Sequence, residues 1–217
     1  MGKTSALLLA CCLAAVALAA QAQGFKFSNP PPGAQAEAQA QRDALIDAQL
    51  STPCRDRIRN RKIMVLIGQE TNGMMSAAQG PFSRHVEAVN LRLQSLGLKT
   101  YSPEQIRKQI AQEEIDAYFK NDPDRALSAS RRMAAQYVLR GVIASSAVRN
   151  PIVDVNQVSV NLNFTLTDAA GRPVSTAAAS NASYAGNDTS GMALTLIEER
   201  ADQVVAKLYS DYCRNAR

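Results

Sequence analysis

The chain has 217 residues and a formal net charge of +5, from 24 Lys and Arg against 19 Asp and Glu. Hydrophobic residues make up 46% of the sequence, so it can build a core, and with no Trp and 5% aromatic residues that core must be aliphatic. The basicity is mild, and no aromatic residues are interleaved with the cations, which argues against a nucleic-acid-binding protein.

Residues 1–22 have the pattern of a secretory signal peptide. Lys3 is the only charge, an apolar run extends from Ala6 to Ala20, and Ala20-Gln21-Ala22 supplies the small residues of a cleavage site. The run is shorter than the roughly 20 residues of a membrane-spanning helix. We therefore expect cleavage after Ala22 and a periplasmic mature chain, with a retained N-terminal anchor as the alternative.

The four cysteines separate into two pairs. Cleavage after Ala22 removes Cys11 and Cys12 and leaves Cys54 and Cys213. Two cysteines that bracket a domain in an exported chain predict one disulfide bond, and the alternative is two unpaired thiols. Leu8-Leu9-Ala10-Cys11 resembles a lipobox, so an outer-membrane lipoprotein acylated at Cys11 remains a second interpretation.

The segment 23–53 differs in composition from the rest. Pro30-Pro31-Pro32-Gly33 predicts a stiff extended stretch, and Ala34 to Leu50 is rich in Ala and Gln without a sustained apolar face. We interpret 23–53 as a tether or a loosely docked helix. Residues 54–217 are then a single domain.

The first half of this domain predicts two strands and three helices. Lys62 to Gly68 is a continuous apolar run typical of a strand buried on both faces, and a polar loop follows over 69–81. An apolar stripe from Phe82 to Leu96 predicts an amphipathic helix, and 98–101 a short strand. Ser102-Pro103-Glu104-Gln105 is a capping box that opens a helix to about Phe119, and Asp122-Pro123 opens another that ends near Ala135.

The second half predicts three strands and a helix. The segment 137–147 is apolar on both faces, 158–166 alternates strictly between apolar and polar residues, and 169–172 is a hairpin turn. The Ala- and Ser-rich segment 173–185 suits a strand at or near a sheet edge, and 190–212 predicts a long amphipathic helix. The order β-α-β-α-β-β-β-α predicts a mixed α/β (α+β) fold: a single mixed sheet with helices packed on it.

The order of elements and several phrases resemble a family of bacterial envelope domains. These phrases are the strand at 62–67 followed by a loop with Asn72, Leu96-Gly97-Leu98 before Tyr101, the stretch from Ala134 to Ile143, and 158–171 with its closing turn. The family includes the periplasmic domain of CsgG and the LpoB-type activators of penicillin-binding proteins. The resemblance covers about residues 60–212 and implies a non-enzymatic domain that binds another envelope protein. The sequence has no long amphipathic insertion of the kind that forms the CsgG pore.

Four patterns in the sequence are candidate sites of chemistry. Gly68 to Gly73 has the glycine spacing of a phosphate loop, but Met74 and Met75 occupy the places of the required Lys and Ser or Thr, so a flexible binding loop is the better interpretation. His85 is the only histidine, and Ser83 or Ser76 could serve as its nucleophile. There is no nucleophile-elbow pattern and no carboxylate at a telling distance, which favours a surface or capping role over a hydrolytic triad. These patterns predict neither an enzyme nor a zinc site.

Two charged clusters complete the set. Glu113, Glu114 and Asp116 offer carboxylates for a divalent cation, but helical neighbours of this kind favour a solvated face. Alternate arginines precede the first strand, and if the segment is extended their guanidinium groups point one way, toward an anionic envelope surface or an acidic partner. The alternative is a solvated strand edge. These arginines are Arg55, Arg57, Arg59 and Arg61.

The sequence therefore predicts a periplasmic adaptor or activator without cofactor, metal or catalytic residues. Its partner is expected to be another cell-envelope protein, bound through the four arginines together with Gln69, Glu70 and Asn72 in the loop after the first strand. The alternative function is a domain that binds a small ligand or saccharide through the loop 69–81.

Overall fold

The computed structural model describes residues 32–71, 73–120, 122–150, 155–183 and 188–215. The expected signal peptide at 1–22, the beginning of the segment 23–53, and Asn72 lie outside these ranges. Within them, no helix combines the length and the apolar character needed to cross a membrane.

One open mixed sheet of six strands forms the centre of the fold, as expected. Its order is β2-β1-β4-β5-β6, with β3 also paired to β1. The β1–β4 and β1–β3 pairs are parallel, and the other pairs are antiparallel. The strands are β1 (Lys62–Thr71), β2 (Met74–Ser76), β3 (Lys99–Thr100), β4 (Tyr137–Asn150), β5 (Val155–Asp168) and β6 (Pro173–Ser183).

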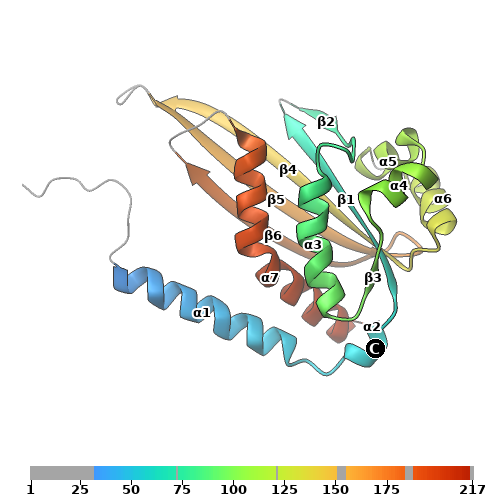
Figure 1. Ribbon diagram of the computed structural model, residues 1–217, viewed down its shortest axis with the longest axis horizontal. Coiled ribbons are helices and arrows are strands. Elements are labelled where there is room, and N and C mark those ends of the chain that lie inside the picture. Colours follow the sequence, from blue (N-terminus) through green and yellow to red (C-terminus); the bar gives the residue numbers. More distant parts are fainter. Residues whose placement is uncertain (1–31, 72, 121, 151–154, 184–187, 216–217) are drawn as a thin grey trace, which may run out of the picture.

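Helices pack on both faces of this sheet, but they cover them unequally (Figure 1). α3 and α7 lie across one face, whereas α4, α5 and α6 gather on the other face beside β1. The helices in the described ranges are α1 (Pro32–Leu50), α2 (Arg55–Ile58), α3 (Ser83–Ser95), α4 (Pro103–Gln109), α5 (Gln112–Phe119), α6 (Pro123–Met133) and α7 (Thr189–Asn215).

The apolar run of β1 is continuous because both faces of the strand are buried. Ile63, Val65 and Ile67 point into the core under α3 and α7. Met64 and Leu66 point into a second core formed with α4, α5 and α6. A strand between two helical layers has no solvated face, so it has no polar alternation.

β5 shows the opposite pattern, since only one of its faces is covered. Leu162 and Phe164 are buried in the core under α7, whereas Asn161 and Asn163 are exposed on the other face. On that face the neighbouring β6 residues Ala178 and Ser180 are exposed too. We call the exposed surface made by Asn161, Asn163, Ala178 and Ser180 the open face.

The segment 69–81 differs from the expected loop. β1 continues to Thr71 and folds back through Gly73 into β2, which gives a hairpin. Gly68 therefore does not end the strand. Its missing side chain makes room for the ring of Phe119, which would lie 2.7 Å from a Cβ at this position.

The helix expected from Ser102 to Phe119 is two helices. The capping box of Ser102 and Gln105 is present as expected and opens α4, but the chain becomes extended at Ile110. α5 then starts anew, with Glu114 Oε2 accepting a hydrogen bond from the Ala111 amide at 3.2 Å. The break lets Ile110 and Ile115 both reach the second core, which one straight helix of this length would not allow.

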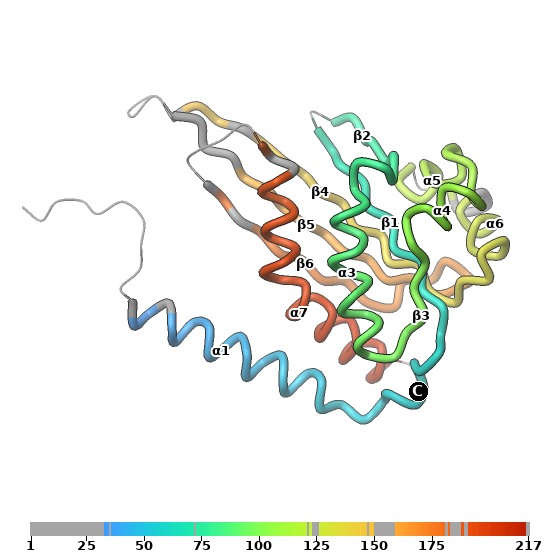
Figure 2. The backbone as a smooth tube through the Cα atoms, in the orientation of Figure 1, coloured from blue at the N-terminus to red at the C-terminus, as the bar shows by residue number. Residues whose placement is uncertain are grey.

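α1 packs against α7 and otherwise extends away from the sheet (Figure 2). Most of its side chains are exposed, and the half-buried ones increase toward its C-terminal end, where Gln49 and Leu50 precede the domain. The chain then turns through Thr52 and Pro53 and enters the domain at Cys54.

Candidate interaction surface at the disulfide corner

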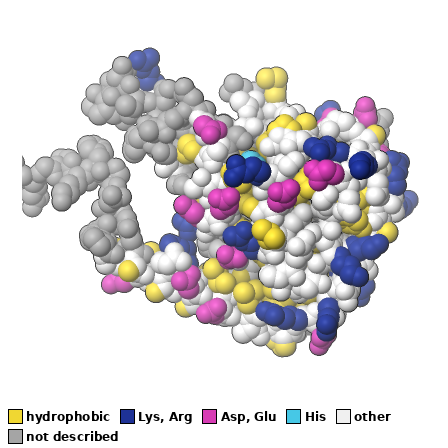
Figure 3. All heavy atoms as spheres, in the orientation of Figure 1, with side chains coloured by type: hydrophobic (Ala, Val, Ile, Leu, Met, Phe, Trp, Pro, Cys, Tyr) yellow, Lys and Arg dark blue, Asp and Glu magenta, His cyan; other side chains and the backbone are white. Residues whose placement is uncertain are grey.

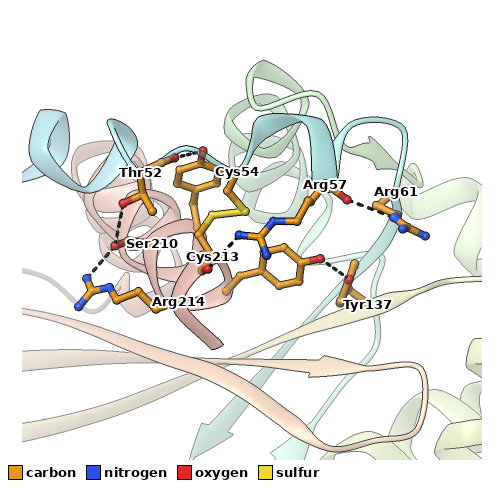
Figure 4. The surroundings of a disulfide bond; sticks show 10 residues. Thr52, Cys54, Arg57, Arg61, Tyr137, Ser210, Cys213 and Arg214 are labelled. Carbon is orange, nitrogen blue, oxygen red and sulfur yellow. Dashed lines mark hydrogen bonds between the residues drawn. A yellow bond between two sulfur atoms is a disulfide. The ribbon is translucent and has the colours of Figure 1, made fainter. Parts of the chain in front are cut away.

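The expected disulfide bond joins Cys54 to Cys213. Their Cα atoms are 5.6 Å apart across a sequence separation of 159 residues, and both side chains are buried. The bond ties the start of α2 to the last turn of α7 (Figure 4). We call this part of the molecule, where the chain enters and leaves the domain, the disulfide corner.

Hydrogen bonds hold the disulfide corner from both sides. The Tyr209 hydroxyl donates to the carbonyl of Thr52 at 2.5 Å, and Arg57 Nη2 donates to the carbonyl of Cys213 at 3.1 Å (Figure 4). Arg214 Nη2 donates to Ser210 Oγ at 2.7 Å. The backbone there is thus fixed by covalent and polar contacts, and a surface built on it is pre-organised.

A pair of tyrosines continues this support toward the sheet. The Tyr137 hydroxyl at the start of β4 donates to the Tyr212 hydroxyl at 2.9 Å, and their rings meet edge to face. Burial, reinforced by the hydrogen bond with Tyr212, raises the pKa of Tyr137 to about 12. The hydroxyl therefore stays protonated over the physiological pH range, and we assign the pair a structural role.

The arginines before β1 do not form the straight row that an extended segment would give. Arg55 and Arg57 lie in the short helix α2, and Asn60 then adopts a left-handed conformation with φ 62°. That turn is held by hydrogen bonds between Asn60 and Gly97 and between Lys99 and Arg61. The alternating arginines thus lie in a short helix and a turn, and their side chains are spread over a corner of the domain.

This corner carries a concentration of positive charge. Arg55, Arg59 and Arg61 are exposed, and none of them lies within 4.0 Å of a carboxylate of the described residues. Lys62 and Arg214 are exposed nearby, and Figure 3 shows dark blue side chains gathered toward the lower right with little magenta among them. We define the basic corner as Arg55, Arg57, Arg59, Arg61, Lys62 and Arg214.

A hollow borders the basic corner where α1 joins the domain. It has a volume of about 470 Å³ and is lined by residues 50–57 and Tyr209. One concave surface therefore brings together the backbone of the turn from Ser51 to Pro53, the buried disulfide and the exposed guanidinium of Arg55. Such a surface can receive a carboxylate-bearing side chain of another molecule.

Gln69 and Glu70, which the sequence grouped with the arginines, lie elsewhere. They are near the far end of β1, seven and eight residues after Lys62, and the rise of an extended strand puts them about 25 Å from Lys62. Gln69 Nε2 is 3.4 Å from Ser145 Oγ, and Glu70 is exposed opposite Met75 in the hairpin. The structure therefore does not join these residues and the arginines into one site.

His85 is buried, contrary to the surface or capping position expected for it. Only 3% of its surface is exposed, and its ring meets Phe82 edge to face with centroids 5.7 Å apart. The helical spacing explains this, because His85 lies three residues after Phe82 and four before Val89, on the same buried stripe of α3. His85 is a core residue of α3.

The acidic cluster on α5 is divided between two roles. Glu114 binds Arg132 of α6 through both carboxylate oxygens, at 2.8 and 2.9 Å, and accepts a hydrogen bond from Ser128 at 2.7 Å. The Ser128 hydrogen bond is the main cause that holds the pKa of Glu114 below its ordinary 4.5. Glu113 is exposed. No group of His, Cys, Asp and Glu suited to a metal ion occurs in the described part of the chain.

A second hollow was not expected from the sequence. It measures about 300 Å³ and lies between α5, α6 and the turn that joins β5 to β6. Arg140 reaches it from β4 and donates to the carbonyl of Tyr118 at 2.6 Å, while Asp168 is held by Arg172 at 2.7 Å. Its charged groups are therefore bonded within the protein. The one sequence signal for it was Arg140, a single charge inside an apolar strand.

Comparison with known sequences identifies no relative. No family model matches the chain, and no curated protein matches it.

Several solved structures align with the chain at low identity. A PelC dodecamer from Paraburkholderia phytofirmans is 17% identical, covering 69% of this chain and 88% of that one, with a TM-score of 0.40. A hypothetical protein from Chlamydia trachomatis is 13% identical, covering 72% and 99%, with a TM-score of 0.47. The LpoB C-terminal domain from Salmonella enterica is 15% identical, covering 64% and 93%, with a TM-score of 0.39.

These matches include the LpoB type named in the resemblance drawn from the sequence, and they do not support a relation to CsgG. Identities below 25% and TM-scores below 0.5 say nothing about what this chain binds.

Proposed function

We propose that this protein is a non-enzymatic adaptor of the bacterial cell envelope, which binds an acidic surface of another envelope protein through its basic corner. The observation that carries the proposal is the set Arg55, Arg59 and Arg61: three exposed guanidinium groups without a carboxylate partner among the described residues. A guanidinium binds carboxylates through two parallel hydrogen bonds, so unpaired arginines suit an acidic partner.

The scaffold beneath these arginines supports the proposal. Arg57 is held against the carbonyl of Cys213, and the backbone on either side of it is fixed by the disulfide bond and the Asn60 turn. Arginines on a rigid backbone lose less conformational entropy on binding than arginines on a mobile loop. A second support is the expected export of the chain, because a disulfide bond persists in the oxidising periplasm.

A pair of charge-matched variants tests the proposal. The corner variant combines Arg55→Gln, Arg59→Gln and Arg61→Gln. The control variant combines Lys108→Gln, Lys120→Gln and Arg131→Gln, which removes the same charge from exposed positions on the α4–α6 side. A photo-crosslinking residue at position 59 in living cells captures the partner, which is then purified and titrated with each variant.

We expect the corner variant to raise the Kd for that partner by about tenfold or more, and the control variant to leave it nearly unchanged. The Kd of the unaltered protein should also rise with salt concentration. Equal binding by the corner variant and the unaltered protein would contradict the proposal. Corner-dependent sedimentation with phosphatidylglycerol vesicles and no protein crosslink would replace it with binding to the membrane surface.

The alternative function, a small-ligand or saccharide site in the loop 69–81, stays a prediction. The structure uses most of that segment for the β1–β2 hairpin and for the buried side chain of Gln79.

A further inference from the structure

The two edges of the sheet are protected very differently. Along the outer side of β1, β3 pairs with Lys62 and Ile63, and β2 pairs with Gln69, Glu70 and Thr71. Between them, the side-chain amide of Gln79 bonds to both the N–H and the C=O of Ile67. This edge therefore offers almost no backbone for a further strand.

The opposite edge is formed by β6, which is 11 residues long and pairs only with β5. Its beginning is covered, because Asn215 Nδ2 donates to the carbonyl of Val174 at 3.1 Å and Ser175 Oγ donates to Asp211 at 2.7 Å. From Thr176 to Ser180, no backbone hydrogen bond runs to any described residue outside β5. The N–H and C=O groups of this stretch that point away from β5 therefore have no backbone partner among the described residues.

The side chains of β6 would not hinder its pairing with a further strand. The strand contains no charged residue, and between Pro173 and Ser183 it consists almost wholly of Ala, Ser and Thr. Soluble proteins usually guard a long edge strand with Lys, with inward-pointing charges, with a bulge or with a covering segment. The half-buried Ala179 of β6 packs against the core.

We infer that β6 pairs antiparallel with β6 of a second copy of this chain, which makes one continuous sheet across a twofold axis. A second copy fits because the strand is uncharged. In a twofold pairing every residue faces a residue of the same strand, and like charges would repel there, whereas Ala, Ser and Thr do not. The main-chain bonds across the axis supply the attraction, and the small side chains let the backbones approach.

Two matched lysine variants test this pairing. The edge variant is Ala178→Lys with Ser180→Lys. The control variant is Asn163→Lys with Asn161→Lys, whose residues are the direct cross-strand partners of Ala178 and Ser180 on β5. All four positions belong to the open face, so both variants add the same charge to the same exposed surface, and only the edge variant adds it at the expected axis.

The molar mass is measured by light scattering and by sedimentation over a range of protein concentrations, with circular dichroism to confirm folding. We expect the unaltered protein and the control variant to form a dimer, and the edge variant to raise the dimer dissociation constant by at least about tenfold. Hydrogen exchange of the outward amides of β6 should slow as the concentration of the unaltered protein rises.

A monomeric unaltered protein at the highest concentration would overturn the inference. So would a dimer that both variants weaken equally, or one in which the β6 amides exchange at a rate independent of concentration. The basic corner is not part of this surface, so failure here leaves the proposed adaptor function untouched.

Discussion

The side-chain amide of Gln79 acts as a short piece of strand against Ile67 of β1. Its Oε1 accepts from the Ile67 amide at 3.2 Å, and its Nε2 donates to the Ile67 carbonyl at 2.9 Å and to the Ala77 carbonyl at 2.6 Å. Gln79 is 1% exposed, so none of these groups can turn to water instead. The chain thus closes the gap between β2 and β3 with a single side chain.

Replacement of Gln79 by Leu should therefore be costly although the volume changes little. The Ile67 amide and the two carbonyls would lose their partners in a buried place, and we expect the free energy of unfolding to fall by about 3 kcal/mol. Urea denaturation measures this. The control Gln94→Leu removes one exposed hydrogen bond to Thr100 and should cost less than about 1 kcal/mol. Equal losses in the two variants would show that Gln79 does not act as a strand.

Loss of the disulfide bond should destabilise the domain substantially. The bond closes a loop of 159 residues, and its removal by Cys54→Ser with Cys213→Ser should lower the free energy of unfolding by about 4 kcal/mol, because the unfolded chain regains the freedom that the loop removed. Dithiothreitol should produce the same loss in the unaltered protein and no further loss in the double variant. Two thiols that alkylate in the native protein without a reductant would refute the bond.

Gly68 should tolerate no side chain while Phe119 is present. A Cβ at this position would lie 2.7 Å from the Phe119 ring, so Gly68→Ala should cost about 2 kcal/mol of unfolding free energy. In a Phe119→Leu background the same change should cost less, since the ring is gone. Gly33→Ala, where no atom lies within 4 Å, is the matched control and should be nearly neutral. Identical costs in the two backgrounds would mean that another contact restricts Gly68.

The contribution of Glu114 to stability should depend on pH. Hydrogen bonding by Ser128 first, and the charge of Arg132 among the further causes, keep its pKa in the folded state below the ordinary 4.5. The stabilisation is therefore present above about pH 4.5 and disappears as the pH falls through the lower folded pKa. The unfolding free energies of the unaltered protein and Glu114→Gln should differ at pH 7 and converge toward pH 3.

The exposed neighbour Glu113 provides the control for this titration. Glu113→Gln removes a carboxylate from the next residue, which is exposed, and should lower the unfolding free energy at pH 7 by less than Glu114→Gln, whose carboxylate bonds to Ser128 and Arg132. Parallel curves for the unaltered protein and Glu114→Gln down to pH 3 would contradict a role for the carboxylate.

Much of the fold could be predicted because its signals are local. The two-sided burial of β1, the alternation in β5 and the capping box at Ser102 each follow from a spacing of residues within one element. The edge position of β6 followed from its Ala and Ser content, and the Cys54–Cys213 bond from counting the cysteines that remain after export.

The failures depend on contacts between distant segments. β2 is three residues long, too short to show an alternation of apolar and polar residues. It is a strand because it pairs with the end of β1. The break at Ile110 arises where the chain must turn to bring Ile115 back to the second core. One missed signal was local, because Glu114 lies three residues after Ala111 and caps its amide at the start of α5.

The candidate site shows the same division. The expected geometry of the arginines needed an extended backbone, and the Asn60 turn held by Gly97 prevents it. Gln69 and Glu70 were singled out because they follow a buried strand, and they lie at the other end of that strand from the arginines.

The bond between Cys54 and Cys213 also has a mechanical consequence. It brings the points where the chain enters and leaves the domain to 5.6 Å between Cα atoms. A force applied between the chain before Cys54 and the chain after Cys213 is carried by the disulfide bond. It does not act on the residues between the two cysteines. The sheet and its helices between the two cysteines would therefore stay folded under a pulling force that would unfold the same chain with its disulfide bond reduced.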